Sequence, residues 1–356
     1  MQDLRLRSRH ELRGATFRPE AGWSVPAGYT SVDTEVRAVR TRAGIIDWSD
    51  RAKIELTGTE RVPFLDGVVT ADVKVLRPNT SAYALLLNEK SRVLGDLRVF
   101  VFPDSLVLDL EMGQRDAILR ILEKARVSDD VEFRDLGAVG HLEVHGPLAG
   151  PLLSDILGSD LRGVPTNEFL TSRTERWGTV HAGRVPSLAG TAYAVWSPAA
   201  DLADAWDGVI AGGATPLGRD AWDVLRIEAG VPRFGADMGE ETLALEVAPE
   251  SALSFTKGCY VGQEVVARGT YVGQIRRKLL GLRTEGDVAP VHGDPVSAQG
   301  HEVGAVTSGA WSPTLRSGIA LALLRLDAVT RANGLSVDRS GWDLRAKLNP
   351  LPFVVA

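Results

Sequence analysis

The C-terminal quarter of the chain is a run of short apolar segments separated by turns, and it limits the possible folds more than any other feature. The segments "LLGLRT", "DPVSAQGHEVGAVTSGAW", "SGIALALL" and "LSVDRSGWDLRAKL" follow one another from about Gly281. Short apolar runs between turns rich in glycine and serine are typical of an all-β unit. We therefore predict a small β-barrel domain over 281–356.

The chain before this segment mixes strands and helices. Apolar runs over 82–111, separated by the turns "NEKSR" and "PDS", indicate a meander of strands. Apolar residues at helical spacing in "QRDAILRILEKAR" predict a helix with one buried stripe. The segment "PLAGPLLSDILG" predicts a second helix, ended by Gly158. The predicted class is α+β with a β C-terminal domain.

Length and charge exclude several classes of protein. The chain has 356 residues, enough for about two domains, and its net charge is 40 − 46 = −6. A negative balance gives no general attraction to nucleic acid or to an anionic membrane. The N-terminal "MQDLRLRSRHELRG" has no apolar run typical of a secretory signal, and no apolar stretch is long enough to span a bilayer. We expect a soluble cytoplasmic protein.

The cysteine and histidine content limits metal chemistry. The single cysteine excludes an intrachain disulfide, a cysteine-based zinc site and the four thiolates of an iron–sulfur cluster within one chain. We interpret His141 and His145 in "HLEVH" as partly exposed sheet residues, with metal ligation as the alternative. The motifs G-x-G-x-x-G after a strand, G-x-x-x-x-G-K-[ST] and G-x-S-x-G are missing, which disfavours a nucleotide hydrolase or a doubly wound nicotinamide enzyme.

The one cysteine, Cys259, lies in an unusual setting. Lys257 precedes it by two residues and Arg268 follows it by nine, while Gly258 and Gly262 leave the backbone bare. A buried free cysteine usually acts as a small hydrophobic side chain. Here the neighbouring cations favour a thiolate, which is the form that reacts and binds metal. The glycines allow close approach by a ligand or a partner. We therefore predict a reactive, accessible thiol.

Two polar residues complete this segment. Gln263 and Glu264 hold the Lys257 ammonium or orient the loop. A single thiolate in this position could ligate iron transiently, exchange sulfur, or attack a one-carbon adduct. The residues alone leave these three chemistries open.

The segment "KGCYVGQE" resembles the signature of the YgfZ family of folate-binding proteins, which are related to the T-protein (aminomethyltransferase) of the glycine cleavage system. "GIIDWS" resembles the family's early strand, "FLDGVVTADV" its first helix, and "GAVTSGAWSPTLRSGIALALL" its C-terminal barrel. Together the similar segments run from about Gly44 to Leu324 in the same order.

This resemblance implies a fold and a function. The fold is an aminomethyltransferase-like cloverleaf of domains around a central hole, with 1–280 forming two interleaved α+β subdomains. The implied cofactor is tetrahydrofolate or a one-carbon derivative. The implied role is in assembly or repair of iron–sulfur clusters, including upkeep of the methylthio-transferases that modify tRNA. The implied partners are folate and iron–sulfur client or assembly proteins.

The resemblance also nominates folate-binding residues. Glu228 in "LRIEAG" occupies the position that binds the pterin in T-proteins. A pterin presents two parallel donors that a carboxylate accepts bidentately. The alternative is a solvated helix glutamate paired with Arg226 or Arg233. The basic run Arg276, Arg277 and Lys278 could hold the carboxylates of a folate polyglutamate tail, face solvent on a strand, or contact a client protein or tRNA.

The segment "LLLNEKSRVLGDLRV" resembles the T-protein segment that carries a catalytic acid. T-proteins have two adjacent acids there, whereas this chain has Gly95 followed by Asp96. If the catalytic acid is the missing one, aminomethyl transfer fails and binding persists. Tyr83 could stack on the pterin or p-aminobenzoyl ring, or pack in the core.

Three hypotheses follow. The first is a tetrahydrofolate-binding accessory factor for iron–sulfur proteins that uses Cys259, with Lys257 and Asp96 as its other reactive groups. The second is a folate-dependent aminomethyl- or methyltransferase. The third is a non-catalytic folate-sensing module. "KGCYVGQE" favours the first, an intact acid pair would favour the second, and a buried inert thiol would favour the third.

Overall fold

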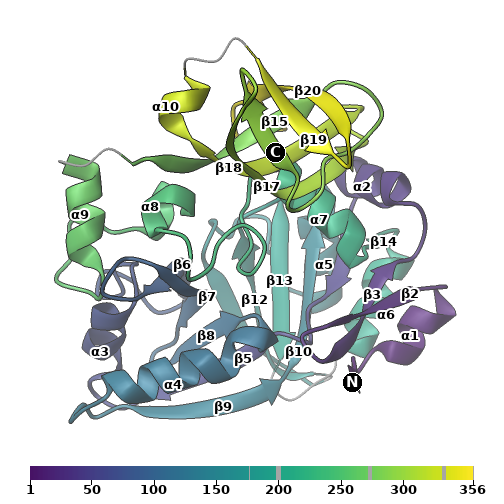
Figure 1. The fold of residues 1–356 in the computed structure, drawn as a ribbon. Helices are drawn as coiled ribbons and strands as arrows, with labels where there is room; N and C mark the ends of the chain where they lie inside the picture. The colour runs from purple at the N-terminus through teal and green to yellow at the C-terminus, as the bar shows by residue number, and fades with distance from the viewer. Residues whose placement is uncertain (176, 198–201, 272–274, 331–333, 356) are drawn as a thin grey trace. The chain divides into compact units, whose positions relative to one another are not determined.

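The computed structural model describes residues 1–175, 177–197, 202–271, 275–330 and 334–355, and the chain divides into two compact units (Figure 1). The first unit contains Met1–Ala84 and Asp96–Trp222. The second contains Leu85–Gly95 and Asp223–Val355. Each unit is therefore built from stretches that are separated in the sequence.

The first unit is a mixture of strands and helices, as the sequence predicts. Its strands are β1 (Gln2–Asp3), β2 (Thr16–Glu20), β3 (Trp23–Gly28), β4 (Gly44–Asp47), β5 (Ala52–Thr57), β8 (Leu106–Leu110), β9 (Glu132–Ala138), β10 (Gly140–His145), β11 (Phe169–Thr174), β12 (Gly178–Val185), β13 (Ala192–Ser197) and β14 (Thr215–Pro216). Its helices are α1 (Arg7–Leu12), α2 (Val32–Thr41), α3 (Arg61–Val68), α4 (Arg115–Ala125), α5 (Ala149–Leu157) and α6 (Ala203–Ala211), with a short 3₁₀ turn at Met112–Gln114.

The strands of this unit form three sheets. A small sheet has the order β1-β3-β2, and a larger one has the order β11-β12-β13-β10-β4-β14. The third sheet, β6-β7-β8-β5-β9, includes the hairpin of β6 (Thr80–Leu87) and β7 (Val93–Val101). The predicted meander over 82–111 is thus confirmed as β6, β7 and β8. The helix predicted from "PLAGPLLSDILG" is α5, and it ends at Gly158 in the left-handed conformation.

A continuous apolar core lies between the larger sheet and the helices α5 and α6. Its fully enclosed members include Ile45 on β4, Val144 on β10 and Val195 on β13. Leu153 on α5 and Trp206 on α6 close it from the helical side. Burial of this apolar surface fixes the position of β10, which has a neighbouring strand on each side.

The second unit carries the predicted barrel. The strands β15 (Arg277–Thr284), β16 (Pro295–Ala298), β17 (His301–Ser312), β18 (Ser317–Arg325), β19 (Leu335–Arg339) and β20 (Trp342–Asn349) close in the order β15-β18-β17-β16-β19-β20. The helices of this unit are α8 (Ala244–Val247), α9 (Gln263–Tyr271) and α10 (Leu326–Val329). The helix α7 (Arg219–Glu228) begins in the first unit and ends in the second. The predicted class, α+β with a C-terminal β-barrel, is confirmed.

The tip of the β6–β7 hairpin belongs to the second unit because it bonds there. Val93 N donates to Thr242 O at 3.1 Å, and Ala244 N donates to Ser91 O at 2.9 Å. The Arg92 guanidinium donates to the Glu241 carbonyl. Within the described ranges, no helix is long and apolar enough to cross a membrane.

Candidate active site

Partly exposed and buried residues alternate along β7, the strand that carries Asp96. Leu94, Asp96 and Arg98 are partly exposed, whereas the residues between them are buried. Successive side chains of a strand point to opposite faces, so Asp96 lies on the polar face. Gly95 lies on the opposite face of β7, the face that also carries the fully enclosed Leu97. An acid at Gly95 would therefore not share the Asp96 face.

Asp96 is held by two neutral side chains. Tyr83 Oη donates to Asp96 Oδ2 at 3.0 Å, and Gln114 Nε2 donates to Oδ1 at 2.9 Å. Burial raises the pKa of Asp96, and the negative charge of Glu111 raises it further, while the hydrogen bond from Gln114 opposes the shift. Burial, followed by the nearby Asp96 charge, raises the pKa of Tyr83 well above its usual value. The site thus contains a carboxyl group that gains a proton more readily than an ordinary aspartate.

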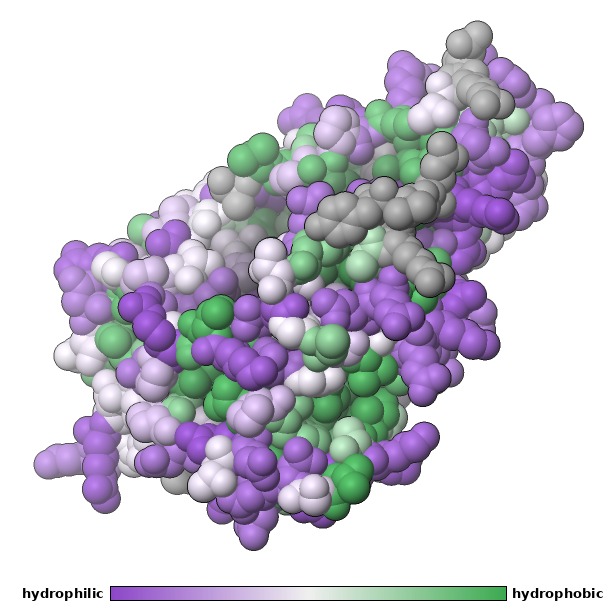
Figure 2. All heavy atoms as spheres, turned by 90° about the vertical axis from the view of Figure 1, so that its left-hand side faces the viewer, coloured by the Kyte–Doolittle hydropathy of each residue, from purple (hydrophilic) through white to green (hydrophobic). Residues whose placement is uncertain are grey.

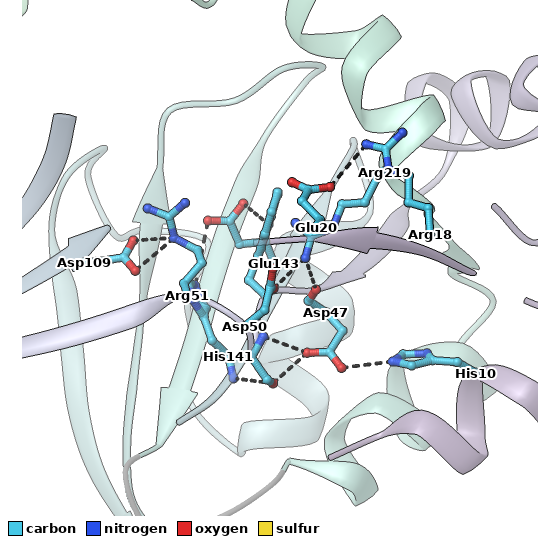
Figure 3. A network of polar contacts seen from close by, with 12 residues as sticks. His10, Arg18, Glu20, Asp47, Asp50, Arg51, Asp109, His141, Glu143 and Arg219 are labelled. Carbon is cyan, nitrogen blue, oxygen red and sulfur yellow. Dashed lines mark hydrogen bonds and ion pairs between the residues drawn. The ribbon is translucent and has the colours of Figure 1, made fainter. Parts of the chain in front are cut away.

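A buried charge network lies in the same unit (Figure 3). Asp109 on β8 accepts from Lys53 Nζ at 2.6 Å and from Arg51 Nε at 2.9 Å. Lys53 Nζ also donates to His141 Nδ1 at 3.2 Å. On β10, Glu143 accepts from His145 Nε2 at 3.1 Å. Buried charges are stable only when they are paired in this way.

Titration in this network follows from burial and from the neighbouring charges. Burial, with Lys53 beside it, lowers the pKa of His141 to about 3, so this ring is neutral. Burial raises the pKa of Glu143, but the hydrogen bond and charge of His145 outweigh it and hold the value at about 2. The pKa of Asp109 is also lowered, because Arg51 and Lys53 together outweigh the effect of burial.

The expectation that His141 and His145 are partly exposed is wrong. Their exposed fractions are 1% and 2%. The reason is the central position of β10, between β13 and β4 in the larger sheet. Across the residues that the structure describes, no group of three or more metal-binding side chains is placed to hold an ion.

Arg219, at the start of α7, is a further polar group that sequence reasoning missed. It is 2% exposed, and its guanidinium carbon lies 3.6 Å from the centre of the Trp48 ring. Nη2 donates to Asp50 Oδ1 at 2.5 Å and to the Asp47 carbonyl at 3.3 Å. Nε and Nη1 have no hydrogen-bond partner among the described residues. Two buried donors without a partner are suited to the oxygen atoms of a bound ligand.

The network continues to the N-terminal helix. His10 Nε2 lies 2.9 Å from Asp47 Oδ2, and the Tyr29 hydroxyl lies 2.8 Å from His10 Nδ1. Ser49 Oγ donates to Asp47 Oδ1 at 2.6 Å. These contacts fix the segment that carries Trp48 and Asp50, so they position the Arg219 partners indirectly.

The loop "KGCYVGQE" lies in the second unit. The Cys259 thiol is exposed, which confirms the predicted accessibility. Lys257 is mostly buried, and its Nζ lies 5.1 Å from the centre of the Tyr260 ring. Gln263 Oε1 accepts from Tyr260 N at 3.3 Å, so Gln263 orients the loop. Glu264 is exposed.

Gly262 shows what one glycine of this loop does. Its φ is +83°, and a Cβ there would lie 2.6 Å from the Asn88 carbonyl oxygen. The Gly262 carbonyl accepts a hydrogen bond from Ser91 Oγ. The group that approaches Gly262 closely is therefore the tip of the β6–β7 hairpin and not a ligand or a partner. The space around Gly258 is open.

On the face shown in Figure 2, hydrophobic residues interrupt a largely hydrophilic surface. Close to Cys259 in the sequence, Phe255, Val261 and Val265 are 38%, 39% and 36% exposed. The thiol is therefore presented on a loop with apolar as well as polar neighbours in the sequence.

The remaining predicted residues are also in the second unit. Glu228 is 0% exposed and accepts from Ser312 Oγ at 2.5 Å, so the alternative of a solvated glutamate is wrong. Arg276 lines a cavity of about 1210 Å³ together with Arg277, whose guanidinium pairs with Glu246 at 3.0 Å. Arg268 lies in α9, but its side chain is outside the described residues.

The structure thus brings together only some of the predicted residues. Tyr83 and Asp96 are in contact, and Lys257 and Cys259 share one loop that leads into Gln263, the first residue of α9. The structure adds a second set of residues, each of which contacts a partner distant in sequence: Arg51, Lys53, Asp109, Gln114, Glu143 and Arg219. Local sequence gave a signal for two of these residues. Arg219 follows "PLG" directly, and Lys53 is a lysine inside an apolar strand.

The chain is thus an α+β protein of two compact units that ends in a closed barrel, with an aspartate, Asp96, held by Tyr83 and Gln114. The GCVT N-terminal domain matches residues 6–257, and the glycine cleavage T-protein C-terminal barrel domain matches residues 277–354. The chain therefore belongs to the aminomethyltransferase family.

Individual relatives agree with this placement. An aminomethyltransferase of Geobacillus kaustophilus is 30% identical, and the match covers 96% of this chain and 95% of the relative. One from Synechococcus is 33% identical, with coverage of 96% and 95%. The crystal structure of the glycine cleavage system aminomethyltransferase T from Bartonella henselae has the same fold, with a TM-score of 0.89, 24% identity and coverage of 99% and 98%. These relatives carry the name aminomethyltransferase and not that of the YgfZ family.

Proposed function

We propose that this chain binds a tetrahydrofolate and transfers a one-carbon unit, in the manner of an aminomethyltransferase, with Asp96 as the acid–base group. The observation that supports this most directly is the environment of Asp96. Its carboxyl group is held by Tyr83 and Gln114 on the polar face of β7, and its pKa is raised by burial. A raised carboxyl pKa is typical of a group that donates and accepts protons during a reaction.

The missing acid at Gly95 does not count against this proposal. Only one of two consecutive strand residues can point to a given face. Asp96 is the one on the face of Tyr83, while Gly95 is buried on the other. A carboxyl group at Asp96 can accept the proton of the folate amine as that nitrogen bonds to carbon, or donate a proton to the departing amine.

Ligand binding has its own candidate residues. Arg219 offers two buried N–H groups, and Glu228 offers a buried carboxylate. A folate carries both hydrogen-bond acceptors and the paired donors of its pterin, so it could engage either group.

The test has two measurements. Calorimetry with tetrahydrofolate checks binding, and release of ammonia from an aminomethylated lipoyl carrier checks transfer. Asp96→Asn should retain binding and lower transfer by about 10²–10⁴-fold, because general acid–base groups contribute about this much. The exposed Asp104→Asn is the matched control and should behave as wild type. Binding without any turnover in the wild type would instead support the folate-sensing module.

One observation favours a second role. The Cys259 thiol is exposed, as an accessory factor in iron–sulfur cluster assembly or repair would require. This role would use iron–sulfur client or assembly proteins as partners, and it does not need transfer activity.

The second role is tested in cells that lack the native protein. Cys259→Ser should leave folate affinity unchanged and abolish the support of iron–sulfur enzymes. Iodoacetamide should label the folded wild type at this one cysteine. Full complementation by Cys259→Ser, or a thiol labelled only after unfolding, would rule the role out.

A further inference from the structure

Gln114 makes a two-point contact with Asp96. Its Nε2 donates to Asp96 Oδ1 at 2.9 Å, and its Oε1 accepts from the Asp96 backbone N–H at 3.1 Å. Gln114 is 6% exposed and ends the 3₁₀ turn Met112–Gln114 that leads into α4. The amide is therefore enclosed and anchored to the main chain of the residue that it contacts.

This geometry fixes which way the amide faces. A backbone N–H can only donate, so the atom that faces it must be the carbonyl oxygen of the Gln114 amide. The NH₂ group must then face Asp96 Oδ1, and an NH₂ group cannot accept a hydrogen bond from a carboxylic acid proton. Oδ1 is consequently held as an acceptor in both protonation states of Asp96.

The other carboxyl oxygen has a different neighbour. The Tyr83 hydroxyl contacts Oδ2 at 3.0 Å, and a hydroxyl group can rotate so as to donate or accept. Because the pKa of Tyr83 is raised by burial, the hydroxyl keeps its own proton.

We infer that Gln114 is a positioning residue that confines the exchangeable proton of Asp96 to Oδ2, on the side of the Tyr83 hydroxyl. This inference rests on the proposed function only in giving that proton a reaction to serve. It assigns the donor oxygen, and with it the direction from which a substrate nitrogen must approach.

Other charges also act on Asp96. Glu111, which follows β8, disfavours the carboxylate through its charge, and Arg51, which precedes β5, favours it through its charge. Replacement of Gln114 by an uncharged side chain leaves both charges in place, so it isolates the contribution of the amide.

The test is a carboxyl-carbon NMR titration of the full chain, labelled with ¹³C-aspartate and recorded without folate. The Asp96 resonance is the one lost in Asp96→Asn. Gln114→Met keeps the side-chain length and removes the donor, so it should raise the Asp96 midpoint by about one to two pH units. Tyr83→Phe should shift it less, because a rotating hydroxyl serves both protonation states. The exposed Gln2→Met should shift nothing.

A second variant guards against misfolding of the first. Gln114→Glu keeps an acceptor for the backbone N–H and puts a second carboxyl group against Oδ1, so the pair should titrate in two steps with one midpoint strongly raised. An unchanged or lowered Asp96 midpoint in folded Gln114→Met, or in Gln114→Glu if the first variant does not fold, would overturn the inference. So would a larger shift in Tyr83→Phe than in Gln114→Met.

Kinetics separates this inference from the proposed function. If transfer occurs, the pH–rate profile of Gln114→Met should move in parallel with its NMR midpoint, a result that loosened folding alone would not give. If the titration behaves as expected and the wild type transfers nothing, the proposed function fails and the assignment of the proton stands.

Discussion

The guanidinium of Arg219 stacks on Trp48, with 3.6 Å between the guanidinium carbon and the ring centre. The same side chain pairs with Asp50, whose pKa is raised by burial even though the Arg219 charge opposes this. One arginine therefore joins the start of α7 to the segment after β4. It does so with both an aromatic and an ionic contact.

Arg219→Met should destabilise the protein strongly. It removes the cation and leaves the Asp50 carboxylate buried without its partner, a change that typically costs about 3–5 kcal/mol. Urea unfolding measures the loss. Asp50→Asn in the same chain should recover part of it, and the exposed Arg37→Met should cost less than about 1 kcal/mol. A loss no larger than that of Arg37→Met would contradict the assigned contacts.

Gly95→Asp should not improve transfer. Its side chain would enter the face of β7 that buries Leu97 and Val99, away from Asp96. An uncompensated buried charge should lower the free energy of unfolding by about 3 kcal/mol or more relative to Gly95→Ala. Unfolding and transfer are measured on both variants. A stable Gly95→Asp with faster transfer would show that the two acids of a pair act on one face.

Stability should fall in acid through Glu143. Its folded pKa of about 2 lies below its ordinary value of 4.5, so the folded state holds the carboxylate more favourably than the unfolded state. This contribution is present above pH 4.5 and is lost as pH falls toward about 2. The difference in unfolding free energy between wild type and Glu143→Gln should shrink across that window. Glu132→Gln, at an exposed position, is the control for the effect of the substitution itself.

The role of Glu228 in ligand binding can be tested separately from its contact with Ser312. If its carboxylate binds the pterin, Glu228→Gln should lower the affinity for tetrahydrofolate by about tenfold to a hundredfold. Ser312→Ala removes only the hydroxyl that contacts Glu228, so it should lower stability with little change in affinity. Calorimetric titration of both variants decides. Unchanged affinity in Glu228→Gln with reduced stability would assign Glu228 to the fold alone.

The sequence predicted what depends on periodicity. The barrel follows from short apolar segments separated by turns, and α4 follows from an apolar stripe at helical spacing, which places Ile118 and Leu122 in the core. Both patterns are local, so neither needs knowledge of the rest of the fold.

Contacts between distant segments could not be read in the same way. Arg219 meets Asp50 across 169 positions, and Lys53 meets Asp109 across 56. His141 and His145 were misjudged because exposure depends on which strands flank β10, and strand order is a property of the whole sheet. The contact of Gln114 with Asp96 was not predicted, since it requires the 3₁₀ turn and β7 to meet.

The hairpin tip at 85–95 has a consequence for synthesis on the ribosome. Arg92 bonds to a residue 149 positions further along the chain. At about 5–20 residues per second, translation takes roughly 7 to 30 s to supply that partner. During this interval the tip has emerged without the residues that cover it. The nascent chain thus exposes donors and acceptors of the β-hairpin tip that have not yet met their partners. A chaperone that recognises exposed strands can bind during this interval.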